Sequence, residues 1–170
     1  KVLNLFAYTG GATLAAAAAG AQVTHVDASK GMVTWAKENA VSSGLGDAPI
    51  RWLVDDCVKF VEREIRRGNT YDAIIMDPPS YGRGPKGEIW KIEDMIHPLI
   101  KLCTKILSKD ALFFLVNSYT TGLAPAVLTY MISTELKPWN GHVESQEIGL
   151  PVTDSGLVLP CGASGRWESD

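Results

Sequence analysis

The amino-acid sequence predicts an α/β fold of the Rossmann-like, doubly wound kind, in which a mainly parallel sheet lies between two layers of helices. Three observations lead to this prediction. Short β-rich apolar segments alternate with helical segments along most of the chain, the chain has 170 residues, and 46% of them are hydrophobic while 21% are charged. This length and balance are those of one domain with a full core, spanning residues 1–170 without a linker.

Five apolar segments have the length and composition of buried parallel strands. They cover residues 2–6, 22–27, 50–55, 73–77 and 112–117. Helices are predicted between them, at about residues 11–19, 29–43, 56–67, 92–108 and 123–136. The fourth helix has the clearest pattern, because its apolar residues from Ile92 to Leu107 recur at helical spacing.

The alternation of strands and helices stops after Pro138. Two extended segments follow, near residues 142–148 and 157–160, with turn-forming residues at 153–156 between them. Such a pattern is typical of an antiparallel hairpin at one edge of a sheet.

Charge and cysteine content exclude several classes of protein. A net charge of −3 argues against a protein that binds nucleic acid over its whole surface, because phosphate binding needs clustered Lys and Arg. The three cysteines contain no CxxC pair, so neither a disulfide framework nor a metal site is expected, and a reducing cytoplasm fits best. No leader and no apolar stretch of about 20 residues is present, so no membrane association is expected. Because the chain starts at Lys1 without a Met, we expect a piece of a longer protein.

The turn after the first predicted strand is a candidate cofactor site. It reads Phe6-Ala7-Tyr8-Thr9-Gly10-Gly11, and its two glycines let a ligand approach the backbone. The next helix offers free N–H groups to a negatively charged group such as a carboxylate. Glycines also occur at this turn for packing alone, so the turn by itself leaves both interpretations open.

Carboxylates follow the second and third predicted strands. Asp27 ends the second, where it can accept hydrogen bonds from both hydroxyls of a ribose. After the third strand, Asp56 is our choice for an adenine amino group, with Asp55 as the alternative, and the next backbone N–H, that of Cys57, can serve a ring nitrogen. Either aspartate can also cap the following helix.

The fourth predicted strand leads into Asp77-Pro78-Pro79-Ser80-Tyr81, the candidate catalytic segment. Two consecutive prolines remove two backbone donors and stiffen the chain, which leaves the carbonyls of Asp77 and Pro78 free to face a substrate. Asp77 and the Pro78 carbonyl can hold an amino group or ring nitrogen of a base, while Tyr81 stacks on its face. A stiff loop without a catalytic role is the alternative.

A glycine-rich basic segment lies just beyond, from Arg83 to Lys91. We expect a flexible loop there that orders on substrate phosphates, with an ordinary solvated loop as the alternative.

Four segments resemble the class I S-adenosylmethionine (SAM)-dependent methyltransferases, and among them the bacterial large-subunit ribosomal RNA methyltransferases of the cytosine-C5 and guanine-N7 type. The matching segments are residues 2–11, 26–29, 35–39 and 77–81. The resemblance implies seven strands in the order 3-2-1-4-5-7-6, with the last strand antiparallel. It also implies a separate RNA-binding domain before the catalytic one, which is absent from this chain, and rRNA as the partner.

Site residues follow from the resemblance position by position. It implies that the methionine part of SAM lies on Phe6 to Gly10, and that the ribose lies on Asp27 with Ala28 and Ser29 beside it. The adenine is expected near Asp56 and Cys57. The target base is expected at Asp77, Pro78, Pro79 and Tyr81.

The sequence departs from the C5 enzymes in one respect. Methylation of carbon 5 of a pyrimidine needs a nucleophile, normally a cysteine thiolate, after the fourth or fifth strand. This chain has Ser80 after the fourth and Asn117-Ser118-Tyr119 after the fifth, and its three cysteines are interpreted as structural. A base nitrogen is therefore the expected target.

Three other functions remain open from the sequence. The same site can methylate a small molecule or a protein side chain, or the domain can bind SAM without transferring a methyl group. A nicotinamide-linked dehydrogenase is less favoured, because Thr9 to Leu14 lacks the G-x-G-x-x-G pattern.

Overall fold

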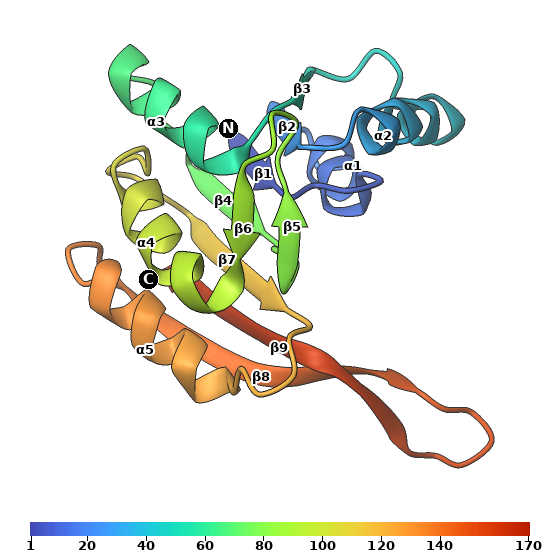
Figure 1. Ribbon diagram of the computed structural model, residues 1–170, viewed down its shortest axis with the longest axis vertical. Helices are drawn as coiled ribbons and strands as arrows, with labels where there is room; N and C mark the ends of the chain where they lie inside the picture. Colours follow the sequence, from blue (N-terminus) through green and yellow to red (C-terminus); the bar gives the residue numbers. More distant parts are fainter.

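A seven-stranded sheet forms the centre of the molecule in the computed structural model, which describes residues 1–170 (Figure 1). The strand order is β3-β2-β1-β4-β7-β9-β8. Counting only the strands of this sheet, the order is 3-2-1-4-5-7-6, as expected. The seventh, β9, runs antiparallel to both of its neighbours, which confirms the predicted class I methyltransferase topology.

The five parallel strands lie within one or two residues of their predicted positions. They are β1 (Val2–Leu5), β2 (Val23–Asp27), β3 (Ile50–Val54), β4 (Ala73–Met76) and β7 (Phe113–Ser118). β1 and β4 are buried along their whole length, because helices cover both of their faces.

Helices α3, α4 and α5 lie on one face of the sheet, and α1 and α2 lie on the other (Figure 1). Their bounds are α1 (Gly11–Ala18), α2 (Lys30–Ser42), α3 (Cys57–Arg67), α4 (Ile92–Thr104) and α5 (Pro125–Glu135). The layer of α3, α4 and α5 encloses the larger core, a cluster of 26 buried residues. A second cluster of five lies under α1, whose alanines allow close packing against the sheet.

The C-terminal hairpin is longer than its sequence suggests. β8 (Gly141–Pro151) and β9 (Val158–Ser169) pair over their whole length, with a register shift between Ile148 and Gly149. The prediction that the second strand covers only residues 157–160 is wrong. Gly162 and Gly165 obscure its pattern, and both occupy places where another chain segment approaches closely.

The tip of this hairpin extends away from the rest of the molecule (Figure 1). Its side chains are mostly apolar and exposed, among them Leu150, Leu157, Val158 and Leu159. No helix of the structure combines the length and apolar character needed to span a bilayer.

Residues 83–91, expected to form a flexible loop, include parts of two short strands that pair as a small antiparallel sheet. The strands are β5 (Tyr81–Arg83) and β6 (Ile89–Lys91), and residues 84–88 form the turn between them. An ion pair between Glu88 and Lys59 joins its turn to α3, at a distance of 2.5 Å between Oε1 and Nζ. Part of the expected loop is therefore regular strand structure, and the ordering of its turn on substrate phosphates stays a prediction.

Candidate active site

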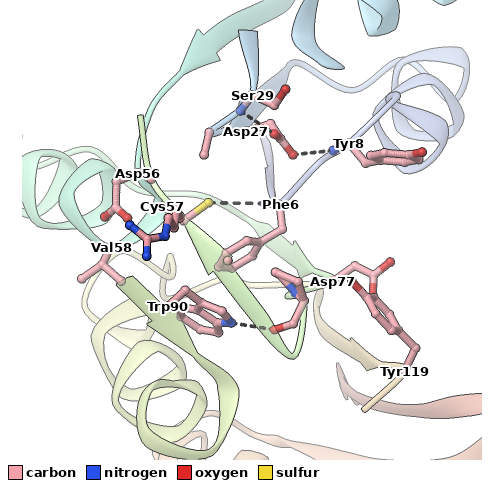
Figure 2. A pocket seen from close by; sticks show the side chains of 15 residues that line it. Phe6, Tyr8, Asp27, Ser29, Asp56, Cys57, Val58, Asp77, Trp90 and Tyr119 are labelled. Atoms are coloured by element: carbon pink, nitrogen blue, oxygen red, sulfur yellow. Dashed lines mark hydrogen bonds between the residues drawn. The ribbon is translucent and has the colours of Figure 1, made fainter. Parts of the chain in front are cut away.

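A cavity of about 540 Å³ opens at the carboxyl ends of β1, β2, β3, β4 and β7 (Figure 2). Ligands of open α/β sheets bind at this edge, and the volume lies within the ~300–1,000 Å³ of small-molecule sites. Its lining brings together residues that are far apart in the sequence. They are Phe6, Tyr8, Asp27, Ala28, Ser29, Asp56, Cys57, Val58, Asp77, Pro79, Gly82, Arg83, Gly84, Trp90 and Tyr119.

The turn after β1 has a strained backbone. Phe6 and Tyr8 have φ angles of 55° and 49°, in the left-handed region that residues other than glycine rarely adopt. Two hydrogen bonds hold the turn: Tyr8 N–H donates to Asp27 Oδ2 at 2.8 Å, and Phe6 N–H donates to Cys57 Sγ at 3.4 Å. Strain of this kind costs about 1–3 kcal/mol per residue and is concentrated at functional sites.

Asp27 is held in a fixed orientation at the end of β2. Its Oδ2 accepts from the N–H of Tyr8, and its Oδ1 accepts from the N–H of Ser29 at 2.8 Å. Each carboxylate oxygen has a second lone pair, so the group can still accept two hydrogen bonds from a ligand.

Gly10 supports helix packing at this turn. It is the N-cap of α1 with φ of 89°, and a Cβ on it would lie 3.1 Å from Ala36 Cβ of α2. Ala7, Thr9 and Gly10 do not line the cavity, and the Thr9 carbonyl accepts a hydrogen bond from Asn39 instead. The structure therefore shows a packing role for Gly10, and its contact with a cofactor stays a prediction.

The two carboxylates after β3 have separate surroundings. Asp56 lines the cavity and also caps α3, because its Oδ1 accepts from Lys59 N–H at 2.9 Å. Asp55 is outside the lining and forms an ion pair with Arg63. The choice of Asp56 over Asp55 therefore agrees with the placement of the two side chains.

Two of the three cysteines, Cys57 and Cys103, are buried and are poor nucleophiles in this structure. Burial raises the pKa of both the Cys57 and the Cys103 thiol well above its usual range, so both stay protonated at neutral pH. Cys161 lies on β9 and does not line this cavity.

Only part of the segment after β4 faces the cavity. Asp77 and Pro79 line it, Pro78 is buried beneath them, and Tyr81 is exposed on β5 outside the lining. Trp90 fixes the segment from the other side, because its Nε1–H donates to the Pro79 carbonyl at 2.7 Å. The carbonyls of Asp77 and Pro78 take no part in this bond and stay available as acceptors.

Aromatic side chains and Asp77 line one side of the cavity. The rings of Phe6 and Trp90 lie 4.8 Å apart in a tilted arrangement, and Figure 2 shows Asp77 between Trp90 and Tyr119. Partial desolvation of the Asp77 carboxyl raises its pKa. The pKa of Tyr119 is also raised, by desolvation first and by the negative charge of Asp77 second, so its phenol stays protonated.

Sequence reasoning did not identify Trp90 or Tyr119 as site residues. Tyr119 directly follows β7, whose carboxyl end lies at the same sheet edge as Asp77, so its position was a usable signal. Trp90 reaches the cavity only through the β5–β6 pairing, which the sequence did not reveal. No group of three or more His, Cys, Asp and Glu side chains is placed to hold a metal ion.

Comparison with known proteins agrees with this architecture. The model of the S-adenosylmethionine-dependent methyltransferase family matches residues 1–135. Ribosomal RNA large subunit methyltransferase K/L of Shewanella frigidimarina is 37% identical over 108 residues, which cover 60% of this chain and 15% of that protein. Ribosomal RNA large subunit methyltransferase K of Neisseria meningitidis is 32% identical over 120 residues, which cover 69% of this chain and 34% of that protein.

A solved structure covers nearly the whole chain. It is a SAM-dependent methyltransferase from Agrobacterium tumefaciens, with a TM-score of 0.94 and 44% identity over 99% of this chain and 56% of that one. The matched residues thus span little more than half of this relative and about a third or less of the two ribosomal RNA methyltransferases. From the match to the family model and the shared sheet order, the chain belongs to the S-adenosylmethionine-dependent methyltransferase family.

Proposed function

We propose that this chain transfers a methyl group from SAM to a base nitrogen of RNA, and that this RNA is ribosomal RNA. One observation supports this above the others: Asp27, Asp56 and Asp77, which end or follow three different strands, line a single cavity. Two carboxylates suited to a nucleoside thus lie beside a third suited to a methyl acceptor.

The cavity has groups that fit the parts of SAM. Asp27 retains two free lone pairs for the ribose hydroxyls, with Ala28 and Ser29 beside it. Asp56 uses Oδ1 as a helix cap, which leaves Oδ2 for the adenine amino group, next to Cys57. Phe6 and Tyr8 line the side nearest the turn after β1, where we place the methionine part.

The Asp77 segment positions the methyl acceptor. SAM, when bound, supplies an electrophilic methyl group on a positively charged sulfur. Asp77 and the Pro78 carbonyl accept hydrogen bonds from the acceptor's N–H groups, which directs the nitrogen lone pair toward the cofactor side of the cavity. The raised pKa of Asp77 also suits its carboxylate to take the proton that the nitrogen loses.

A nitrogen acceptor is favoured over carbon 5 of a pyrimidine. Carbon 5 needs a thiolate nucleophile, and the one cysteine in the cavity, Cys57, is buried and donates no reactive thiolate at neutral pH. A base nitrogen carries its own lone pair and needs only orientation.

RNA as substrate is supported by the two ribosomal RNA methyltransferases to which the chain is similar. The net charge of −3 gives the chain little general affinity for phosphates. We therefore include in the proposal a separate RNA-binding domain preceding this one, and a cytoplasmic location with the ribosomal RNA. Arg83, which lines the cavity, is the residue of the β5–β6 hairpin placed to meet a substrate phosphate.

Methyl transfer from tritiated SAM to total RNA of cells that lack the gene tests this proposal. We expect label in RNA, and a loss of at least about 100-fold in turnover for Asp77→Ala, with SAM affinity nearly unchanged. Label in protein or small metabolites instead would reject RNA as the substrate. Full turnover by Asp77→Ala would remove Asp77 from the mechanism.

A further inference from the structure

A second cavity, of about 410 Å³, adjoins the first. It lies between the segment 119–125, which leads from β7 into α5, and residues 160–163 of β9. We call it the β9 groove. Tyr119 lines both the groove and the larger cavity, so its side chain lies at the boundary between them.

The β9 groove has the wrong charge for a phosphate. No Lys or Arg lines it, and its one charged side chain is Glu147. The other polar groups of the lining are neutral, among them the hydroxyls of Thr120 and Thr121 and the thiol of Cys161. Such a lining suits an uncharged ring, and the carboxylate of Glu147 can accept a hydrogen bond from an exocyclic amino group.

Tyr119 has the properties of a stacking platform at the boundary between the cavities. The residue is 55% exposed, and exposed aromatic rings beside a nucleic-acid site bind bases through their faces. The backbone beneath it is fixed. A Cβ on Gly162 would lie 2.8 Å from Tyr119 Cα, so only glycine lets β9 pack against this segment.

A hydrogen bond joins the groove to the candidate catalytic segment. The hydroxyls of Ser80 and Thr120 are 2.7 Å apart, which ties the loop after β4 to the loop after β7. The two walls that hold a target base and its neighbour therefore form one connected structure.

We propose that the β9 groove is a subsite for the nucleotide next to the methylated one in single-stranded RNA. The base of that nucleotide stacks on Tyr119 and presents an amino group, as in adenine or cytosine, to Glu147. This inference rests on the proposed function and adds to it a preference for the flanking sequence.

Thiol labelling tests whether RNA enters the groove. Cys161 is the one cysteine that is not buried, so N-ethylmaleimide should modify it in preference to Cys57 and Cys103. With the full chain and saturating S-adenosylhomocysteine, fragmented ribosomal RNA from cells that lack the gene should slow labelling of Cys161 about tenfold. S-adenosylhomocysteine alone should leave the rate unchanged, because it occupies the other cavity.

Activity and labelling together separate this inference from the proposed function. Methyl transfer to RNA without protection of Cys161 would overturn the subsite and leave the proposed function standing. If no methyl group is transferred to RNA, both are overturned.

A matched pair of substitutions at the start of α5, one at its N-cap and one in its first turn, gives a second readout. Ala124→Trp fills the groove and should raise KM for RNA about tenfold, with kcat and SAM affinity within about twofold. Ala126→Trp, which adds the same ring to an exposed position outside the lining, is the control and should behave as the unmodified chain. An equal effect of both substitutions would contradict the subsite.

Competition by short homopolymers tests the base preference. Five-residue oligomers of adenylate or cytidylate should inhibit methyl transfer to ribosomal RNA about fivefold more strongly than the uridylate oligomer, which has no amino group. Glu147→Ala should abolish that difference. A difference that persists in Glu147→Ala would overturn the role given to Glu147.

Discussion

Individual carboxylates of this protein differ in what surrounds them. Asp27 receives two backbone hydrogen bonds and Asp56 caps a helix, yet both keep acceptor capacity toward the cavity. Asp55 is adjacent in sequence to Asp56, but its carboxylate is engaged in an ion pair with Arg63. A carboxylate can bind a ligand only if some of its hydrogen-bond acceptor sites remain free after its bonds within the protein are counted.

Asp27→Asn should weaken SAM binding by about 10- to 100-fold, because an amide has one acceptor oxygen where the carboxylate has two charged ones, and each charged hydrogen bond contributes ~1.5–3 kcal/mol. Isothermal titration calorimetry measures the change. Asp55→Asn is the control, since Asp55 lies outside the cavity. Equal affinities for Asp27→Asn and the unmodified chain would exclude Asp27 from the cofactor site.

Buried His25 makes stability depend on pH. It lies in the core, 2.9 Å from Thr13 Oγ1, and burial lowers its pKa to about 4. In the unfolded chain His titrates near ~6.5. Between pH 6.5 and 4 the unfolded state therefore binds more protons, so stability is lost as the pH falls through this window.

The free energy of unfolding should drop by about 3 kcal/mol across that window because of His25 alone. Urea denaturation at several pH values measures it. Carboxylates also titrate near the lower end, so His25→Gln serves as the reference curve and should show a flatter pH dependence. Parallel curves for the two proteins would refute this role of His25.

Tyr81 and Tyr119 show what a single sequence can predict at this scale. The motif placed Asp77 and Pro79 correctly at the cavity, because a motif at the end of a strand fixes where the strand's carboxyl end delivers it. The motif did not predict the position of Tyr81. This residue lies on β5 outside the cavity lining, and β5 is held there by pairing with β6, in which Tyr81 lies opposite Lys91. Stacking by Tyr81 stays a prediction, and the structure offers Tyr119 for the same task.

At the scale of elements, regular strands and helices were predictable and glycine-containing strands were not. Apolar runs in the sequence located β1, β2, β3, β4 and β7. Parallel strands that are covered on both faces consist almost entirely of apolar residues, so a short apolar run is enough to identify them. β9 was missed in part, because Gly162 and Gly165 have no side chains to give an alternating pattern. Glycine is required at both positions because the chain packs closely there against Ser118, Tyr119, Leu128 and Ile132.

Gly162→Ala should destabilise the protein by about 2–4 kcal/mol, since the added Cβ meets the backbone of Ser118 and Tyr119 and φ at this residue is 148°. It should also reduce methyl transfer, because Tyr119 must move. Thermal unfolding followed by circular dichroism gives the stability. Gly156→Ala is the matched control, with a positive φ but open space around it, and should cost only about 1 kcal/mol. Equal losses would show that close packing at Gly162 is unimportant.

The whole molecule places residues from the first 119 positions around one cavity, because parallel strands deliver their carboxyl ends to the same edge. The β8–β9 hairpin completes the sheet and adds the β9 groove beside that cavity. Under the proposed function, residues that end or follow β1, β2 and β3 bind the cofactor, and residues that follow β4 and β7 position the methyl acceptor, without a catalytic cysteine.

Mass-spectrometric identification of the methylated nucleoside tests the central claim most directly. RNA from cells that lack the gene is incubated with the protein and deuterated-methyl SAM, then digested to nucleosides. The account predicts a nucleoside with the heavy methyl group on a base nitrogen. A heavy methyl group on carbon 5 of a pyrimidine would contradict it, because that product requires a cysteine thiolate which this site does not provide.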